Sequence, residues 1–556
     1  MGARQQGAAL LVMLAIIVLG ISYLLVSRVN TASGFAAIDR ERNGQLLNQA
    51  KQALIGHVAH IAAQQTEANP GRVPCPEAPG NFGTANEGIA AGNCTLPAVG
   101  RLPWRTLGLD KLVDASGEPL WYVVSPGWAL SNSTTPPLTT FINSNSAGGL
   151  TVDAAASDSV ALIIAPGPAF TVGAAGACAA WSQVRPTSGT PDRRNYLECE
   201  NAAAATFVTR GPSGSFNDQL VRVTTADLLP AIEAAIAHRI ERDIAPQLRQ
   251  VYTAASGWER SPGVALPAGT SLFPFAAAFS DPEASADPDP DPLRPDRSVY
   301  QGAAGTYAGL APLARHVPGS IAWINPATAS VTLLGGQPFS VVSSVDCTAS
   351  TATVLRCDIV YAVAPIIAVD VDAANIGTGF RQAPGIQSNL VITPGLGNAS
   401  GTLSNSLRPD GSARVRITLT TSLVGLLGSF TVQLTLNAAE HPVIDDLATA
   451  NAWYLSNEWH KLSLYAVSQG FAPASAGACG GANPACLTIQ DARYPAATRH
   501  AILLLAGRTL SSIGQTRPNS TLANYLEGEN VLPLDETFRR GAASRTINDR
   551  VVAVAP

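Results

Sequence analysis

The first apolar stretch of the chain covers nineteen residues, from Ala8 to Val26, and its only polar side chains are those of Ser22 and Tyr23. At 1.5 Å rise per residue, a helix of this length spans about 30 Å, close to the thickness of the hydrocarbon core of a bilayer. The pattern predicts a transmembrane helix over residues 8–27 that carries everything after it.

Other interpretations of this stretch compete with a processed N-terminus. A cleaved secretory signal has a hydrophobic region of about 7–15 residues and small residues at its cleavage site. The present stretch is longer, although small residues follow it at 31–34. An uncleaved signal anchor fits the length. The leader that precedes the stretch ends in Gly7, which favours cleavage directly after that residue.

Two amphipathic helices are predicted from apolar positions that recur every three or four residues. The first lies between residues 46 and 62. The second begins at a good N-cap residue, Thr225, and is expected to kink near Pro246. Their apolar stripes consist of Leu46, Leu47, Ala50, Leu54, Val58, Ile61 and Ala62 in the first helix, and of Leu228, Ile232, Ile236, Ile240, Ile244 and Leu248 in the second.

The sequence that follows the first amphipathic helix returns in altered form later in the chain. Four pairs of segments match in the same order at offsets of 343, 340, 329 and 331 residues, namely 122–128 with 465–471, 161–167 with 501–507, 195–198 with 524–527, and 216–223 with 547–554. Collinear self-similarity of this kind indicates a duplicated unit, here a helix plus a sheet.

The duplication predicts a domain organisation of two heads. The first head covers 36–224 and the second covers 225–556. The surplus length of the second maps to 328–445, where apolar and polar residues alternate between Gly, Asn and Ser turns. Such alternation is typical of a small β-sandwich, so we predict a β-rich insert there.

Composition favours an exported, loop-rich protein. Charged residues make up only 13% of the 556 residues, and the chain contains 49 Gly and 40 Pro, whereas charged residues form about a quarter of a typical globular domain. The formal net charge is −5. A chain without a basic excess lacks the electrostatic footprint of a nucleic-acid-binding protein.

Eight cysteines occur as four sequential pairs. Zinc binding is not indicated, because there is no CxxC motif and no His at zinc-ligand spacing from any pair. An even number of cysteines in an exported chain is typical of disulfides in an oxidising compartment, with free thiols in the core as the alternative. The candidate disulfides join Cys75 to Cys94, Cys178 to Cys199, Cys347 to Cys357, and Cys479 to Cys486.

An acidic stretch between 281 and 296 offers a weak calcium site. Calcium binds six to eight oxygen ligands. The alternation of Asp with Pro also favours an extended, solvated linker, which is the preferred interpretation. The candidate ligands are Asp281, Glu283, Asp287, Asp289 and Asp291.

Two short polar motifs recur in the two predicted heads. Asn-Tyr-Leu-Glu occurs at 195–198 and 524–527, and an Asn-Asp pair occurs at 217–218 and 548–549. Side chains of this kind stabilise loops and turns, which explains them without catalysis. None of the seven histidines lies in a recognised catalytic motif. We therefore expect a protein without enzymatic activity and without a cofactor.

Several motifs resemble those of one known family. Arg4-Gln-Gln-Gly7, followed by Ala8 and the apolar stretch, resembles a type IV prepilin N-terminus. Pro-Cys-Pro at 74–76, Gly-Arg-Leu-Pro-Trp at 100–104 and the aromatic strand that starts at Trp121 resemble the minor pseudopilins of type II secretion. Val12 departs from the pattern, since most pilins carry Glu there, although some minor pilins and the large tip pseudopilin also lack it.

The resemblance implies processing and partners. It implies cleavage by a prepilin peptidase between Gly7 and Ala8, methylation of Ala8, and packing of the N-terminal helix against other pilins or pseudopilins. It covers residues 1–225 well, the second head in part and the insert not at all. The large aromatic residues are expected to seal a small sheet onto a helix, with sugar stacking as the alternative. They are Trp104, Trp121, Tyr122 and Trp128.

These patterns together predict an α+β chain. A transmembrane helix continues into an amphipathic helix, and two tandem pilin-like heads follow, each a helix on an antiparallel sheet, the second with the β-rich insert. The expected function is that of a minor pseudopilin or pilin at a tip or initiator position. The expected location is the bacterial inner membrane, crossed once, with the bulk of the chain periplasmic or extracellular. The alternative is a membrane-anchored adhesin or ligand-binding protein that uses the insert.

Overall fold

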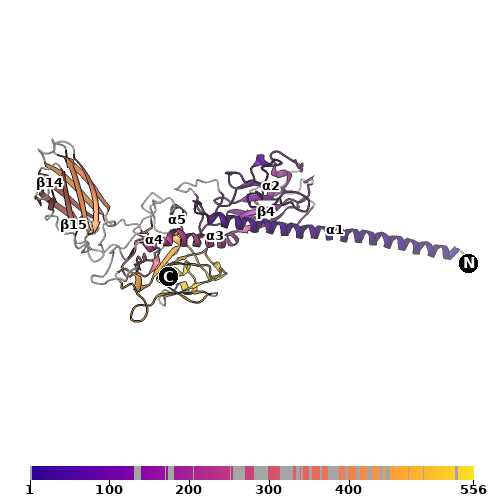
Figure 1. Ribbon diagram of the computed structural model, residues 1–556. Coiled ribbons are helices and arrows are strands. Elements are labelled where there is room, and N and C mark those ends of the chain that lie inside the picture. Colours follow the sequence, from indigo (N-terminus) through magenta and orange to yellow (C-terminus); the bar gives the residue numbers. More distant parts are fainter. Residues whose placement is uncertain are drawn as a thin grey trace. The chain divides into compact units, whose positions relative to one another are not determined.

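The structure of the protein is a computed structural model (Figure 1) that mixes helices with antiparallel sheets. Within residues 3–36 it describes the helical backbone and the side chains of 16–19, 21 and 22. Elsewhere it describes residues 37–129, 140–169, 171–172, 181–203, 206–213, 215–250, 252–253, 270–280, 299–313, 443–444, 451–473, 475–491, 494–531 and 536–555, and the backbone of the strands between 330 and 437. The calcium candidates Asp281, Glu283, Asp287, Asp289 and Asp291 lie outside the described residues.

The N-terminal helix α1 (Ala3–Ala62) corrects the expectation of a membrane anchor. Within the described part of the chain, no helix combines the length and the apolar character required to cross a membrane. The transmembrane helix predicted over 8–27 and the single-pass inner-membrane location are therefore wrong. The apolar stretch does not form an element of its own, because it belongs to a helix that continues through charged residues such as Arg40 and Glu41.

The chain divides into two compact units. The first consists of Met1–Ala62, Gly71–Ser133 and Ser146–Ile232, and the second of Ala63–Pro70, Thr134–Asn145 and Glu233–Pro556. The first unit contains a sheet in the order β1-β2-β4-β3, with β7 also paired to β4 and all pairs antiparallel. Its strands are β1 (Ala98–Arg101), β2 (Trp121–Val124), β3 (Leu150–Val152), β4 (Ala155–Ala165) and β7 (Gln219–Thr224).

Both faces of this first sheet are covered. Helix α1 contacts β4 and β7 and buries Leu47, Ala50, Leu54, Val58 and Ala62 from its predicted apolar stripe. Side chains on the opposite face form a second apolar layer that includes Trp121, Val123, Leu162 and Ile164. Because successive side chains of a strand point to opposite faces, a sheet covered on both sides needs continuous apolar strands. All four residues of β2 are accordingly buried.

The second unit contains a sheet with the strand order β10-β20-β23-β25, which corresponds to β1-β2-β4-β7 of the first. Its strands are β10 (Ala308–Leu310), β20 (Ser463–Val467), β23 (Ala501–Leu505) and β25 (Arg550–Ala555). Helix α4 (Ala245–Gln250) and the π-helical turn η3 (Ile240–Ile244) contact β25. They continue helix α3 (Thr225–Arg239), and the turn comes just before Pro246, which lacks an N–H for a regular helical bond.

The strands between 330 and 437 form two further antiparallel sheets, in the orders β12-β11-β15-β18-β17 and β13-β14-β19-β16. They are β11 (Ser330–Thr332), β12 (Pro338–Phe339), β13 (Val342–Ala349), β14 (Val354–Ala362), β15 (Ile366–Ala373), β16 (Gln387–Pro394), β17 (Ala399–Leu407), β18 (Ala413–Thr421) and β19 (Ser429–Asn437).

Short elements complete the two units. Those of the first are η1 (Pro79–Asn81), β5 (Thr171–Val172), β6 (Trp181–Ser182), η2 (Arg193–Asn195) and α2 (Cys199–Ala203). Those of the second are β8 (Tyr252–Thr253), β9 (Ser271–Leu272), α5 (Ala452–Ser456), η8 (Trp459–Leu462), η9 (Gln469–Phe471), β21 (Leu487–Asp491), β22 (Ala497–Arg499), η10 (Ser511–Ile513), η11 (Leu522–Asn524), η12 (Gly528–Val531) and β24 (Thr537–Arg540).

Two of the predicted disulfides are present. Cys75 is bonded to Cys94 and Cys479 to Cys486, with Cα–Cα separations of 5.9 and 5.3 Å. Cys199 is also disulfide-bonded, whereas Cys178 lies outside the described residues. In the β13–β14 register, Cys347 stands directly opposite Cys357. Their side chains are outside the described part of the chain.

We predict that Leu54→Ala lowers the free energy of unfolding of the first unit by about 2–5 kcal/mol, because it leaves a cavity between α1 and the sheet. Leu54 is 0% exposed, whereas Ile38 on the same helix is 62% exposed. The matched change Ile38→Ala should stay within about 0.5 kcal/mol of the parent. Urea unfolding followed by circular dichroism measures both, and equal effects of the two changes would contradict this packing.

Candidate functional site

Each unit contains a buried polar network around one glutamate and one aspartate. In the first unit these are Glu198, which follows the short helix η2, and Asp218, which directly precedes strand β7. Glu198 is 0% exposed and Asp218 is 6% exposed. Both belong to the recurring motifs of the sequence, and the structure brings the two motifs into direct contact.

The Glu198 carboxylate accepts hydrogen bonds from the residues that precede β7 and from Gln183. Its Oε2 accepts from the backbone N–H groups of Asn217 at 3.0 Å and Asp218 at 3.1 Å. Its Oε1 accepts from the side-chain amide of Gln183 at 2.8 Å. A buried carboxylate is tolerable when donors satisfy its oxygens, and here three N–H groups do so.

Asp218 accepts hydrogen bonds from the loop that carries Glu198. Its Oδ2 accepts from the backbone N–H of Glu198 at 3.1 Å and from the side-chain amide of Asn201 at 2.9 Å. Each acid therefore accepts from the backbone N–H of the other. This reciprocity resembles a helix capping box, in which two side chains satisfy each other's backbone donors, and it ties the loop at 195–201 to the start of β7.

The two carboxyl groups of this network lie close enough to influence each other's ionisation. Burial raises the pKa of Asp218 well above its usual range, and the nearby charge of Glu198 raises it further. Burial also raises the pKa of Glu198, but hydrogen bonds from Asn217 and Gln183 oppose this effect. Two adjacent carboxyl groups cannot both ionise cheaply in a buried site. We therefore assign one shared proton to the pair, with Asp218 as its donor.

An arginine fixes the outer part of the network. Arg185 donates from Nε to the carbonyl of Asn195 at 3.1 Å and from Nη1 to the carbonyl of Gly167 at 2.8 Å, and its guanidinium lies 5.1 Å from the centre of the Tyr196 ring. Gly167 has a φ of +67°, and a Cβ atom there would lie 2.8 Å from the Asn217 side chain. The Pro-Gly turn after β4 therefore requires glycine.

The second unit repeats these contacts around Glu527 and Asp549. As in the first unit, burial and the charge of the neighbouring glutamate raise the pKa of the aspartate. Glu527 accepts hydrogen bonds from Asn548 N (2.9 Å), Asp549 N (3.2 Å) and Gln515 Nε2 (2.8 Å). Asp549 accepts from Glu527 N (2.8 Å) and Asn530 Nδ2 (3.1 Å). Arg517 donates from Nε to the Asn524 carbonyl and from Nη1 to the Gly507 carbonyl, both at 2.7 Å.

Sequence reasoning found half of each network. It selected Asn195, Glu198 and the Asn-Asp pair, and it missed Gln183, Arg185 and Asn201 with their counterparts. A signal for them existed, because Gln515 and Arg517 follow Gln183 and Arg185 by 332 residues, and Asn530 follows Asn201 by 329. Extending the repeat alignment residue by residue at offsets between 329 and 332 would have identified all three.

The second network borders a cavity of about 490 Å³. Asp549 lines it together with His238, Glu241 and Arg540. The two pairs of acids, Glu198 with Asp218 and Glu527 with Asp549, are suited to holding the backbone in place. In each unit, neighbouring N–H groups donate hydrogen bonds to most of the carboxylate oxygens.

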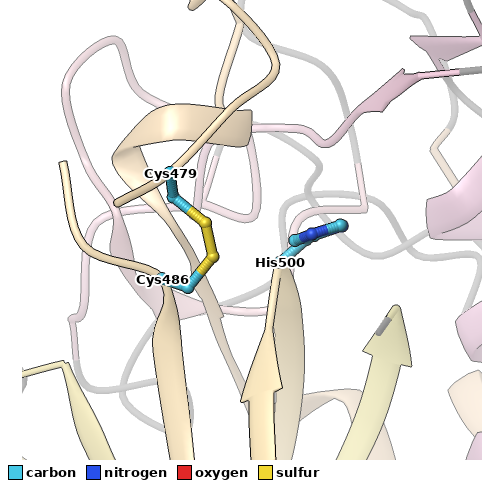
Figure 2. Close-up of side chains that lie close together, drawn as sticks. All are labelled: Cys479, Cys486 and His500. Carbon is cyan, nitrogen blue, oxygen red and sulfur yellow. A yellow bond between two sulfur atoms is a disulfide. The ribbon is translucent and has the colours of Figure 1, made fainter. Parts of the chain in front are cut away.

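A separate cluster has the residue types of a metal site. The ligand atoms of Cys479, Cys486 and His500 lie within 4.8 Å of one another, and Figure 2 shows the disulfide beside the imidazole. The sequence spacing did not indicate this proximity of a His to a Cys pair. The disulfide leaves no thiolate for a metal. The rings of His500 and Phe471 are stacked with their centroids 3.5 Å apart. Burial lowers the pKa of His500. The oxidised cluster is therefore a packing element.

Comparison of the chain with protein-family models, with curated proteins and with solved structures finds no match.

We predict opposite effects for two isosteric changes in the first network at pH 7. Asp218→Asn keeps an oxygen for both donors and removes an acid that must stay protonated, so it should raise the free energy of unfolding. Glu198→Gln places an NH₂ group against N–H donors and should lower it by about 1–3 kcal/mol. Urea denaturation measures both, and destabilisation of similar size by both changes would contradict a shared proton.

The contribution of Asp218 to the stability of the parent should fall as pH rises above about 4. Because the pKa of Asp218 is raised in the folded state, the folded chain holds a proton that the unfolded chain has released, and stability decreases with pH until the folded pKa is reached. The slope is at most about 1.4 kcal/mol per pH unit for this group. Asp218→Asn should show a shallower decline between pH 4 and 7, measured by thermal unfolding, whereas parallel profiles would exclude the raised pKa.

Proposed function

We propose that the protein is a structural subunit of a pilin-like or pseudopilin-like assembly, in which α1 packs against the N-terminal helices of other such subunits. The observation that carries this proposal is the apolar surface on the part of α1 that precedes the first sheet. Ile16, Ile17, Val18, Leu19 and Ile21 are 64%, 47%, 54%, 69% and 54% exposed.

These residues surround the helix instead of lying on one side. Consecutive residues of an α-helix are about 100° apart, so the run from Ile16 to Leu19 covers every direction around the axis. A helix that is apolar all round is normally buried in a larger assembly, and contiguous exposed apolar surface marks an interaction site. The part of α1 between Leu47 and Ala62 already packs on the sheet. The apolar residues near position 19 remain for contacts with other chains.

The N-terminal helices of similar subunits are the partners that fit this apolar surface. Helices pack along one another when apolar side chains interdigitate over several turns, which gives axial separations of about 8–10 Å. A bundle of such helices buries every side of each helix, as the distribution of apolar residues around α1 requires. The resemblance of the Arg4–Val12 segment to prepilin N-termini supports the same assignment.

A tip or initiator position suits this subunit better than a place within a regular filament. The chain carries two compact units for a single N-terminal helix, and the second unit would obstruct regular stacking. Val12 replaces the Glu of most pilins. In this proposal a prepilin peptidase cleaves between Gly7 and Ala8 and Ala8 is methylated.

We predict that Ile17→Asp abolishes co-assembly. An Asp in a dry helix–helix contact would be a buried, unpaired charge, so the variant should be lost from the sheared filament fraction of the host, quantified by immunoblot. Ile38→Asp is the matched control, because Ile38 is also exposed on the same helix (62%, against 47% for Ile17) but lies near the packed part. Equal recovery of Ile17→Asp and the parent would refute packing through this surface.

Processing is tested separately by N-terminal mass spectrometry. The chain purified from hosts with and without prepilin peptidase should begin at Ala8 only when the peptidase is present. An N-terminus at Met1, or beyond Ser33, in both hosts would exclude the prepilin assignment.

A further inference from the structure

A cavity of about 460 Å³ opens at the edge of the first sheet, beside strand β1. Its floor includes Val99 and Arg101 from β1 and Trp121 from β2, and its walls come from the segments 77–79 and 190–194. All of these residues belong to the first unit. The volume lies within the range of small-molecule sites, about 300–1,000 Å³.

The floor presents buried donors that make no hydrogen bond within the described part of the chain, although Arg101 Nη1 lies 3.8 Å from Glu77 Oε1, whose carboxylate is also without a hydrogen bond. Arg101 and Trp121 are cross-strand partners in the β1–β2 register, so their side chains stand on the same face of the sheet. Arg101 is 3% exposed and Trp121 is 1% exposed. Among the described residues, the indole Nε1 and the guanidinium Nε and Nη1 atoms have no hydrogen-bond partner. Buried donors without partners are uncommon in folded proteins and require an explanation.

The guanidinium of Arg101 is held in place by other groups. Its Nη2 donates to Glu87 Oε1 at 2.6 Å, and it lies 4.0 Å from the centre of the Phe82 ring. These two contacts fix the plane of the guanidinium. A guanidinium held in this way is pre-organised to donate to a further acceptor from Nε or Nη1.

The charge around this floor is not balanced. Glu87 also accepts from Lys111 at 2.9 Å, so its single negative charge serves two cations. Glu77 lies 3.8 Å from Arg101 Nη1, and burial raises the pKa of its carboxyl. At the rim, Asp192 pairs with Arg194 at 2.7 Å, and Arg193 adds a further positive charge. The residues at the cavity and next to it therefore carry a small net positive charge.

We propose that this cavity binds a carboxylate, which accepts hydrogen bonds from Trp121 Nε1 and from one of the free N–H groups of the Arg101 guanidinium. A singly charged, planar anion matches the small positive surplus and the fixed plane of the guanidinium. A doubly charged anion would be repelled more strongly than a singly charged one by Glu77, Asp192 and Glu87, which lie at or next to the cavity. The carboxylate belongs either to a free small acid or to the C-terminus of a peptide. This proposal is independent of the assembly role of α1.

The test follows the indole N–H resonances of the full chain labelled with ¹⁵N-tryptophan. Acetate, a tripeptide with a free C-terminus and the same tripeptide amidated at its C-terminus are titrated in turn, and Trp121→Phe identifies the Trp121 signal. We expect acetate and the free tripeptide to shift that signal to saturation. Trp128 is an internal control that should not shift, because its Nε1 already donates to the Ala147 carbonyl at 2.9 Å.

The three ligands separate the possible sources and outcomes. Tighter binding of the free tripeptide than of acetate assigns the site to peptide C-termini, and equal binding assigns it to small acids. Binding of the amidated tripeptide as tight as that of the free one would overturn the proposal, because the carboxylate would then be irrelevant. Absence of any Trp121 shift in the folded chain would also overturn it.

Two variants test the named donors. Arg101→Lys keeps a cation for Glu87 but removes the free guanidinium N–H groups, and it should weaken binding about tenfold or more. Trp121→Phe keeps the apolar floor and removes one donor, so it should also weaken binding, as measured by the line shape of ligand signals. Thermal unfolding confirms that each variant is folded. Parent affinity in both folded variants would exclude these donors.

Discussion

Reciprocal capping by two buried acids is the constraint on which each unit depends. The last strand of either sheet begins at an Asn-Asp pair whose backbone N–H groups are buried and need acceptors. A glutamate from a distant loop supplies them, and the aspartate of the pair satisfies that glutamate's own N–H in return. The loop and the strand thus fix each other, and the cost of burying two acids is limited by sharing one proton.

The same solution occurs twice with different surroundings. The strand orders β1-β2-β4-β7 and β10-β20-β23-β25 correspond, and so do the arginines that close each network. Other features differ between the units: the first has the donor-lined cavity at its sheet edge, and the second has the Cys479–Cys486 disulfide beside His500. The shared network therefore supports the fold, while the surfaces around it diverge.

Local patterns predicted what depends on local physics. Apolar spacing placed the buried stripe at 47–62, and cysteine pairing along the chain predicted the disulfides of Cys75 and Cys479 correctly. The same reasoning failed for the apolar stretch at 8–26, which it assigned to a membrane span, because no helix in the described part of the chain has the length and apolar character to cross a membrane. Gln183 could have been found by extending the repeat alignment. The roles of Arg101 and Trp121 as a pair escaped notice for a different reason. Their significance arises from neighbours brought together only by folding.

The buried position of the shared proton has a kinetic consequence. A proton held between two acids with almost no exposed surface cannot exchange with solvent while the loop and strand remain joined. It leaves only when that region opens, and local opening of this kind is slower than proton diffusion by many orders of magnitude. After a sudden change of pH, each unit would keep its earlier protonation state until it next opened, so its response would be timed by its own motions.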